Sequence, residues 1–188
     1  MPLAVGCSMR ELDRFTLSDA MGLVAASAVG VALARSFYEQ DASLGPIQYR
    51  SWVYLTALLV MPFTAALAWS RLRRPWTARR LAREPGAVAL LAAAISVALI
   101  FLEEVLSVAL PGPPGTRSIR NSWSPVVGSA GWLAVLPGPM VLVAWSTQWL
   151  AGRWRPGPGW IDRAGRALGM TWIVLYALRA WVLFHLWP

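Results

Sequence analysis

Five long apolar stretches constrain the fold of this chain more than any other feature. They cover residues 17–37, 52–70, 87–110, 126–151 and 167–187. Each has about 19 to 26 residues, enough to cross a hydrocarbon core of about 30 Å as a helix. Lipid cannot hydrogen-bond a free backbone, and the stretches lack the two-residue alternation of a membrane β-barrel. We therefore predict an all-α integral membrane protein with five transmembrane helices in one domain, residues 1–188.

The composition agrees with a membrane protein and argues against a soluble or disordered one. Hydrophobic residues make up 57% of the chain and charged residues 14%, with a mean hydropathy of +0.51. A typical globular domain has about 25% charged residues. The net charge of +8 would suggest nucleic acid as a partner of a soluble protein. Here the arginines lie between the apolar stretches, so we expect membrane lipids as partners and no nucleic acid.

The distribution of arginine predicts how the chain is oriented. The N-terminal segment and the loops at residues 71–86 and 152–166 together hold 12 arginines, and the two other loops hold 4. Positively charged loops favour the cytoplasmic side. We therefore place the N-terminus in the cytoplasm and the C-terminus outside, in a multi-pass protein of the cytoplasmic (cell inner) membrane.

The first stretch begins with a capping pattern and carries a repeat of small residues. Thr16 and Asp19 form the T-x-x-D pattern of a capping box, which predicts that a helix starts there. The small residues recur at every fourth position: Gly22, Ala26, Gly30 and Ala34. Such spacing leaves a smooth groove where another helix backbone can approach closely. The helix that docks there belongs either to this chain or to another subunit.

The fourth stretch is interrupted near its middle by Pro137, Gly138 and Pro139. Proline removes a backbone donor and clashes with the preceding turn, so we predict a kinked span. The alternative is a re-entrant hairpin made of two short half-helices. That arrangement would place the loops around Arg117 and Arg153 on the same side, which weakens the charge asymmetry.

Two adjacent acidic residues, Glu103 and Glu104, lie inside the third stretch. An ionised side chain at the centre of a membrane helix costs about 2.5 to 3.5 kcal/mol, so this helix needs a partner, a protonation or a shallower position. Arg179 lies at a similar depth in the fifth stretch. We predict that Arg179 pairs with one of the glutamates, because adjacent positions on a helix point about 100° apart.

Ser107 and His185 complete the predicted polar cluster. Ser96, Glu103 and Ser107 share one helix face, and Glu104 points toward solvent, a partner subunit or His185. A structural ion pair that fixes helix packing is the main interpretation, and a proton or cation pathway is the alternative. The single histidine excludes bis-histidine haem within one chain. A His/Met haem or a pigment is chemically allowed without specific support, so the cofactor is left unknown and no metal site is predicted.

The loop after the second stretch is rich in arginine. This composition predicts that the loop binds anionic lipid headgroups. Each arginine near a membrane surface contributes about 1 kcal/mol of attraction. The residues assigned to this role are Arg71, Arg73, Arg74, Arg79 and Arg80.

The motif search is negative for catalysis. The sequence has no P-loop, G-x-G-x-x-G, G-x-S-x-G or H-E-x-x-H pattern. We therefore expect a non-enzymatic integral membrane subunit that packs against partner membrane proteins in a larger complex. A proton or cation channel or carrier using Glu103 and Glu104, with the break at Pro137 as its hinge, is the alternative. A small lipid-modifying membrane enzyme is a further alternative.

Overall fold

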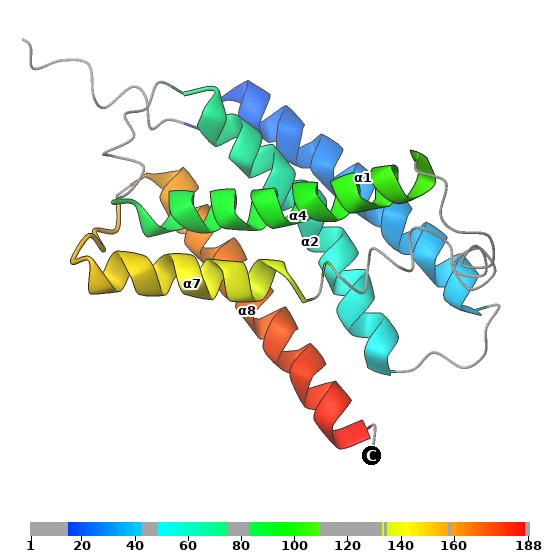
Figure 1. Ribbon diagram of the computed structural model, residues 1–188. Coiled ribbons are helices and arrows are strands. Elements are labelled where there is room, and N and C mark those ends of the chain that lie inside the picture. The colour runs from blue at the N-terminus through cyan, green and yellow to red at the C-terminus, as the bar shows by residue number, and fades with distance from the viewer. Residues whose placement is uncertain are drawn as a thin grey trace, which may run out of the picture.

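The computed structural model describes residues 15–42, 49–74, 83–109, 133, 135–157 and 159–186. Within these ranges, the regular elements are helices, which confirms the predicted all-α class for this part of the chain (Figure 1). They are α1 (Leu17–Ala42), α2 (Tyr49–Leu72), α4 (Pro85–Ala109), α7 (Pro137–Leu150) and α8 (Trp160–Leu186).

Three of these helices are long and apolar enough to cross a membrane. The segments are Leu17–Ser36 in α1, Trp52–Leu72 in α2 and Pro85–Glu103 in α4. They indicate a membrane protein by length and composition. Helix α8 has 27 residues, whereas α7 has 14 and is shorter than the roughly 20 residues that a complete crossing needs. The count of five crossings and the orientation of the chain stay predictions.

Helix α7 begins at the proline pair for which a kink was predicted. Pro137 occupies the start of the helix, where its missing N–H would have no partner within the helix in any case. Pro137 and Gly138 are both buried. Residues 126–132 of the predicted fourth span lie outside the described residues, so a continuous kinked span stays a prediction.

The capping box at the start of α1 is confirmed. The backbone N–H of Asp19 donates to Oγ1 of Thr16 at 3.2 Å. In return, the backbone N–H and the hydroxyl of Thr16 donate to Oδ2 of Asp19 at 3.0 and 2.8 Å. The pair satisfies N–H groups that the first turn leaves open, so the helix begins at Leu17 as the pattern predicts.

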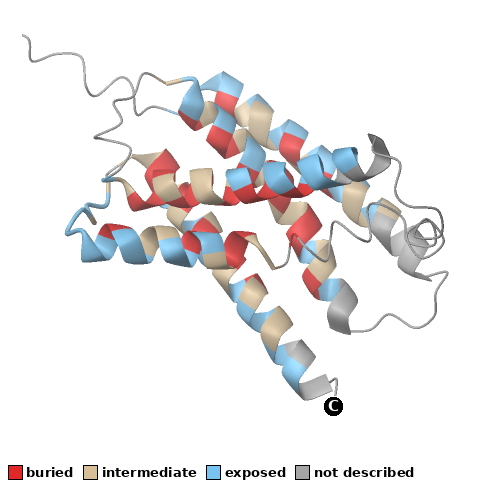
Figure 2. Ribbon diagram, viewed as in Figure 1, coloured by how far each residue is buried: buried red, intermediate tan, exposed pale blue. Residues whose placement is uncertain are grey.

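The apolar core lies among α2, α4, α7 and α8. Helix α4 packs against all three of the others, and α4 and α7 lie side by side in Figure 1. Buried core residues come from each helix, including Ala57, Ala93, Val141 and Trp172. Helix α1 packs mainly against α2, so much of its surface is exposed (Figure 2).

Ends of all five helices gather at one end of the bundle, which we call the junction end. The starts of α1, α4 and α8 and the ends of α2 and α7 meet there, joined by the contacts described below. Successive helices therefore run in opposite directions. The described parts of the two arginine-rich loops lie together at this end.

Candidate functional site

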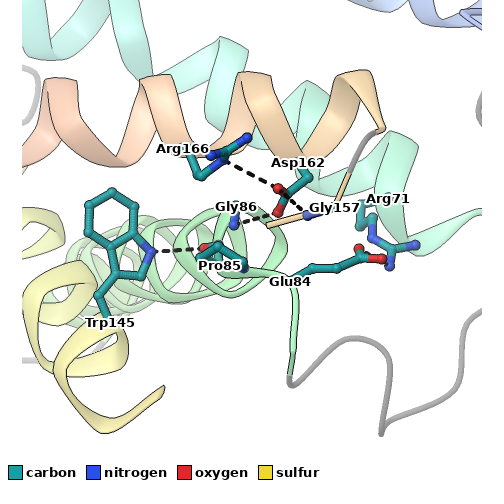
Figure 3. Close-up of polar contacts among 8 residues, drawn as sticks. All are labelled: Arg71, Glu84, Pro85, Gly86, Trp145, Gly157, Asp162 and Arg166. Atoms are coloured by element: carbon teal, nitrogen blue, oxygen red, sulfur yellow. Dashed lines mark hydrogen bonds and ion pairs between the residues drawn. The ribbon is translucent and has the colours of Figure 1, made fainter. Parts of the chain in front are cut away.

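The junction end is organised around the buried carboxylate of Asp162, in the first turn of α8 (Figure 3). Its Oδ1 accepts a hydrogen bond from the backbone N–H of Gly86 at 2.7 Å. Its Oδ2 accepts one from the backbone N–H of Gly157 at 3.0 Å and lies 3.3 Å from Nε of Arg166, one turn along the helix. One side chain thus caps α4, fixes the loop that follows α7 and neutralises an arginine.

The protonation of Asp162 reflects two opposing influences. The group precedes the apolar stretch that begins at residue 167. Removal from water raises the pKa of this carboxyl group above its ordinary value of 3.8. The N–H donors of Gly86 and Gly157 and the positive charge of Arg166 favour the ionised form and offset part of this rise.

Glycines allow α4 and α8 to cross in close contact beside Asp162. A side chain at Gly86 would collide with the backbone carbonyl of Asp162, and one at Gly165 would collide with the carbonyl of Gly86. One turn further, a Cβ at Gly169 would lie 2.9 Å from Cβ of Ala89. Gly165 and Gly169 form the small-x-x-x-small spacing that brings helix backbones together in membranes. This pattern is visible in the sequence, but its partner helix is not, because Gly86 and Ala89 lie about 80 positions away.

Two further ion pairs join α1, α2 and α4 at the junction end. Nη2 of Arg71 lies 2.9 Å from Oε2 of Glu84, and Nη2 of Arg74 lies 2.8 Å from Oδ2 of Asp19. All four side chains are largely buried. The Arg74 guanidinium also lies over the ring of Trp160, at 5.7 Å from its centroid. Arg71 and Arg74, predicted to bind headgroups, are therefore engaged in contacts that hold helices together.

Of the other three arginines predicted to bind headgroups, the structure describes only Arg73. Arg73 is exposed, with its guanidinium 4.7 Å from the centroid of the Trp69 ring. Arg79 and Arg80 lie outside the described residues. The headgroup-binding role of this loop stays a prediction.

Tryptophan side chains connect α7 to the junction end. Nε1 of Trp145 donates to the carbonyl of Pro85 at 2.8 Å, so α7 is joined to the first residue of α4 (Figure 3). The ring of Trp145 also meets that of Trp154 edge to face, with centroids 5.6 Å apart. These rings are anchors within the fold as well as candidates for the membrane interface.

The polar cluster predicted around the two glutamates is described only in part. Glu103 is exposed on α4. Arg179 places its guanidinium 5.3 Å from the centroid of the Tyr54 ring, which joins α8 to α2. The side chains of Glu104, Ser107 and His185 are not described. Pairing of Arg179 with a glutamate therefore stays a prediction.

A buried polar contact within the bundle was not anticipated from the sequence. Nε1 of Trp172 in α8 donates to Oγ1 of Thr64 in α2 at 3.0 Å, and both residues are almost fully buried. The Thr64 hydroxyl donates in turn to the carbonyl of Val60 at 3.1 Å. Ser96, also buried, bonds the carbonyl of Ala92 in its own helix at 2.8 Å. Trp172, Thr64 and Ser96 thus form their hydrogen bonds within the chain.

The small residues predicted to form a groove on α1 have different surroundings. A Cβ at Gly30 would lie 3.1 Å from the carbonyl oxygen of Leu59, and Ala26 is buried, so these positions face α2. A Cβ at Gly22 would meet nothing within 4 Å. Ala34 is half-buried.

The chemistry of the junction end is that of capping and charge neutralisation. Among the described residues, no three His, Cys, Asp or Glu side chains gather where they could hold a metal ion. Asp162 was not among the site residues predicted from the sequence. The usable signal was an acidic residue in the first turn of a helix, a position that favours contact with free N–H groups. Its long-range partner, Gly86, has no such local signal.

Comparison of the chain with family models, curated proteins and solved structures finds no match.

Proposed function

We propose that the chain is a non-catalytic integral membrane subunit that packs against a partner membrane protein through the outer surface of α1. The observation that carries this proposal is the weak burial of α1 within the chain. Only 17% of its apolar segment is buried, against 44% for the segments of α2 and α4. A helix with so little contact inside its own bundle has most of its surface available to another molecule.

The composition of that surface favours a protein over lipid. Four small residues and one valine follow one edge of α1 at alternating intervals of four and three, and we call this set the α1 seam: Ser18, Gly22, Ala25, Val29 and Ala32. Gly22 is half-buried and the other four are exposed. The spacing is that of a left-handed helix pair, and small residues permit the close backbone approach on which membrane helix association depends.

Site-directed photo-crosslinking in the native membrane tests the proposal. A photoreactive residue at Ala25, on the seam, should form a discrete protein adduct. The matched control is Val31, which is also exposed on α1 but points about 120° away from Ala25. Equal adduct yields at the two positions, or lipid adducts alone at Ala25, would remove the support for a specific partner.

Purification in a mild detergent provides an independent measurement. The proposal predicts that the chain elutes with a second protein in a fixed ratio, and that the adduct formed at Ala25 contains this protein. A stable monomer with nothing bound would argue against it.

A further inference from the structure

Three exposed arginines at the junction end have no ion-pair partner among the described residues. They are Arg83, before α4, and Arg153 and Arg155, after α7. The backbone N–H of Arg155 donates to the carbonyl of Arg83 at 3.1 Å, so two loops distant in sequence hold their arginines at neighbouring positions. The backbone N–H of Arg153 donates to the carbonyl of Gln148 at 2.9 Å, which fixes the third arginine to the end of α7.

The nearby described acidic groups are already occupied. Glu84 pairs with Arg71, and the carboxylate of Asp162 accepts two backbone N–H groups and faces Arg166. Among the described residues, the fold therefore holds these arginines on neighbouring loops without an acidic side chain that pairs with them. Such an arrangement is stabilised by an external anion, because like charges repel and each guanidinium offers paired donors.

The position of these arginines relative to the apolar surface identifies the anion. Trp149 and Leu150, in the last turn of α7, are 70% and 77% exposed and directly precede the loop that carries Arg153 and Arg155. In Figure 2 this loop is the exposed segment at the left, between α7 and α8. Exposed tryptophan next to arginine is typical of the boundary between acyl chains and headgroups, where arginine reaches phosphate.

We propose that Arg83, Arg153 and Arg155 form a binding site for the phosphate of an anionic phospholipid, with Trp149 and Leu150 against its acyl chain. The planar guanidinium groups hold phosphate oxygens in pairs, which a lysine ammonium cannot do. This site requires that the bundle lies in a membrane and is independent of any partner at the α1 seam. It also differs from the loop at Arg71–Arg80, in which two arginines are paired internally.

Native mass spectrometry of the delipidated full-length protein tests the site. Phosphatidylglycerol should bind more tightly than phosphatidylcholine. Each of Arg83→Gln, Arg153→Gln and Arg155→Gln should weaken phosphatidylglycerol binding about fivefold, and the triple variant on the order of a hundredfold. The triple Arg→Lys variant keeps the charge and should fall between the two. The control Arg35→Gln removes an exposed arginine of α1 away from the junction end and should leave binding unchanged.

Three results would overturn the site. One is an equal loss of phosphatidylglycerol binding in Arg35→Gln, which would indicate a general effect of charge. The second is equal binding of phosphatidylcholine. The third is displacement of the lipid by an equal concentration of inorganic phosphate, which would make free phosphate the ligand. Circular dichroism confirms that the variants stay folded, and resistance to alkaline carbonate extraction tests membrane insertion separately.

Discussion

The carboxylate of Asp162, in the first turn of α8, accepts a hydrogen bond of 2.7 Å from the backbone N–H of Gly86, in the first turn of α4. The two residues lie 76 positions apart in the chain. This bond brings the starts of two parallel helices together, and glycine at position 86 makes the distance attainable because any side chain would collide with the backbone of Asp162.

Removal of the Asp162 side chain should destabilise the bundle. Asp162→Ala leaves the buried N–H group of Gly86 and the half-buried N–H group of Gly157 without an acceptor, at a cost of about 2 to 3 kcal/mol. Asp162→Asn keeps one acceptor oxygen and should lose less. Thermal unfolding in detergent, followed by circular dichroism, measures the difference. The contact would be unimportant if Asp162→Ala melted at the same temperature as the parent.

The contribution of Asp162 to the stability of the protein should change with pH. Its native pKa lies above the ordinary value of 3.8, so between the unfolded and native pKa values the native state binds more protons than the unfolded state. The contribution of this group to stability is therefore greatest below pH 3.8 and falls as the pH rises through that window. The melting temperature of the parent minus that of Asp162→Asn should decrease from pH 3.8 upward and then level off. An increase over the same range would show that the native pKa is lowered instead.

The close crossing of α4 and α8 should not tolerate a methyl group. Gly165→Ala places a Cβ against the carbonyl of Gly86 and within 2.9 Å of Cδ1 of Leu90. We expect a loss of about 1 to 3 kcal/mol from overpacking. Gly22→Ala is the matched control because its Cβ meets nothing within 4 Å. Equal melting temperatures for the two variants would show that the contact between α4 and α8 at Gly165 is not tight.

The buried bond between Trp172 and Thr64 should contribute measurable coupling between α8 and α2. Thr64→Val keeps the shape but removes the acceptor of the indole N–H. A double-mutant cycle with Trp172→Phe should give a coupling of about 0.5 to 1.5 kcal/mol. The same cycle with Thr56→Val, whose hydroxyl is exposed and bonds only the carbonyl of Trp52 in its own helix, should give none. Equal values in the two cycles would contradict a specific bond.

The helices and the capping box could be predicted because their causes are local. Apolar runs of sufficient length specify membrane helices, and Thr16 and Asp19 cap α1 from within a single turn. The pairing of Asp162 with Gly86 depends on how two distant helices cross, and no periodicity encodes it. Nor could spacing show that Gly30 would face Leu59 while Gly22 stays open, because that depends on the rotation of α1 against α2.

The roles of the individual arginines could not be predicted from the sequence for the same reason. Their number between the apolar stretches suggested one surface that binds headgroups. In the structure, Arg71 and Arg74 are largely buried in ion pairs, whereas Arg83 and Arg155 are exposed and held together by a backbone bond. Charge count predicts which ends of the helices gather. Only the tertiary structure shows which arginines form ion pairs between helices and which are exposed.

The most direct test of the proposed packing role compares Gly22→Leu with Gly30→Leu by the mass of the complex in mild detergent and by the melting temperature. Gly22→Leu fills an open position on the α1 seam, so the account predicts an unchanged melting temperature and loss of the partner from the complex. Gly30→Leu collides with the backbone of α2 at Leu59 and should lower the melting temperature itself. A Gly22→Leu protein that keeps its partner in full, or a parent protein that is only ever monomeric, would contradict the account.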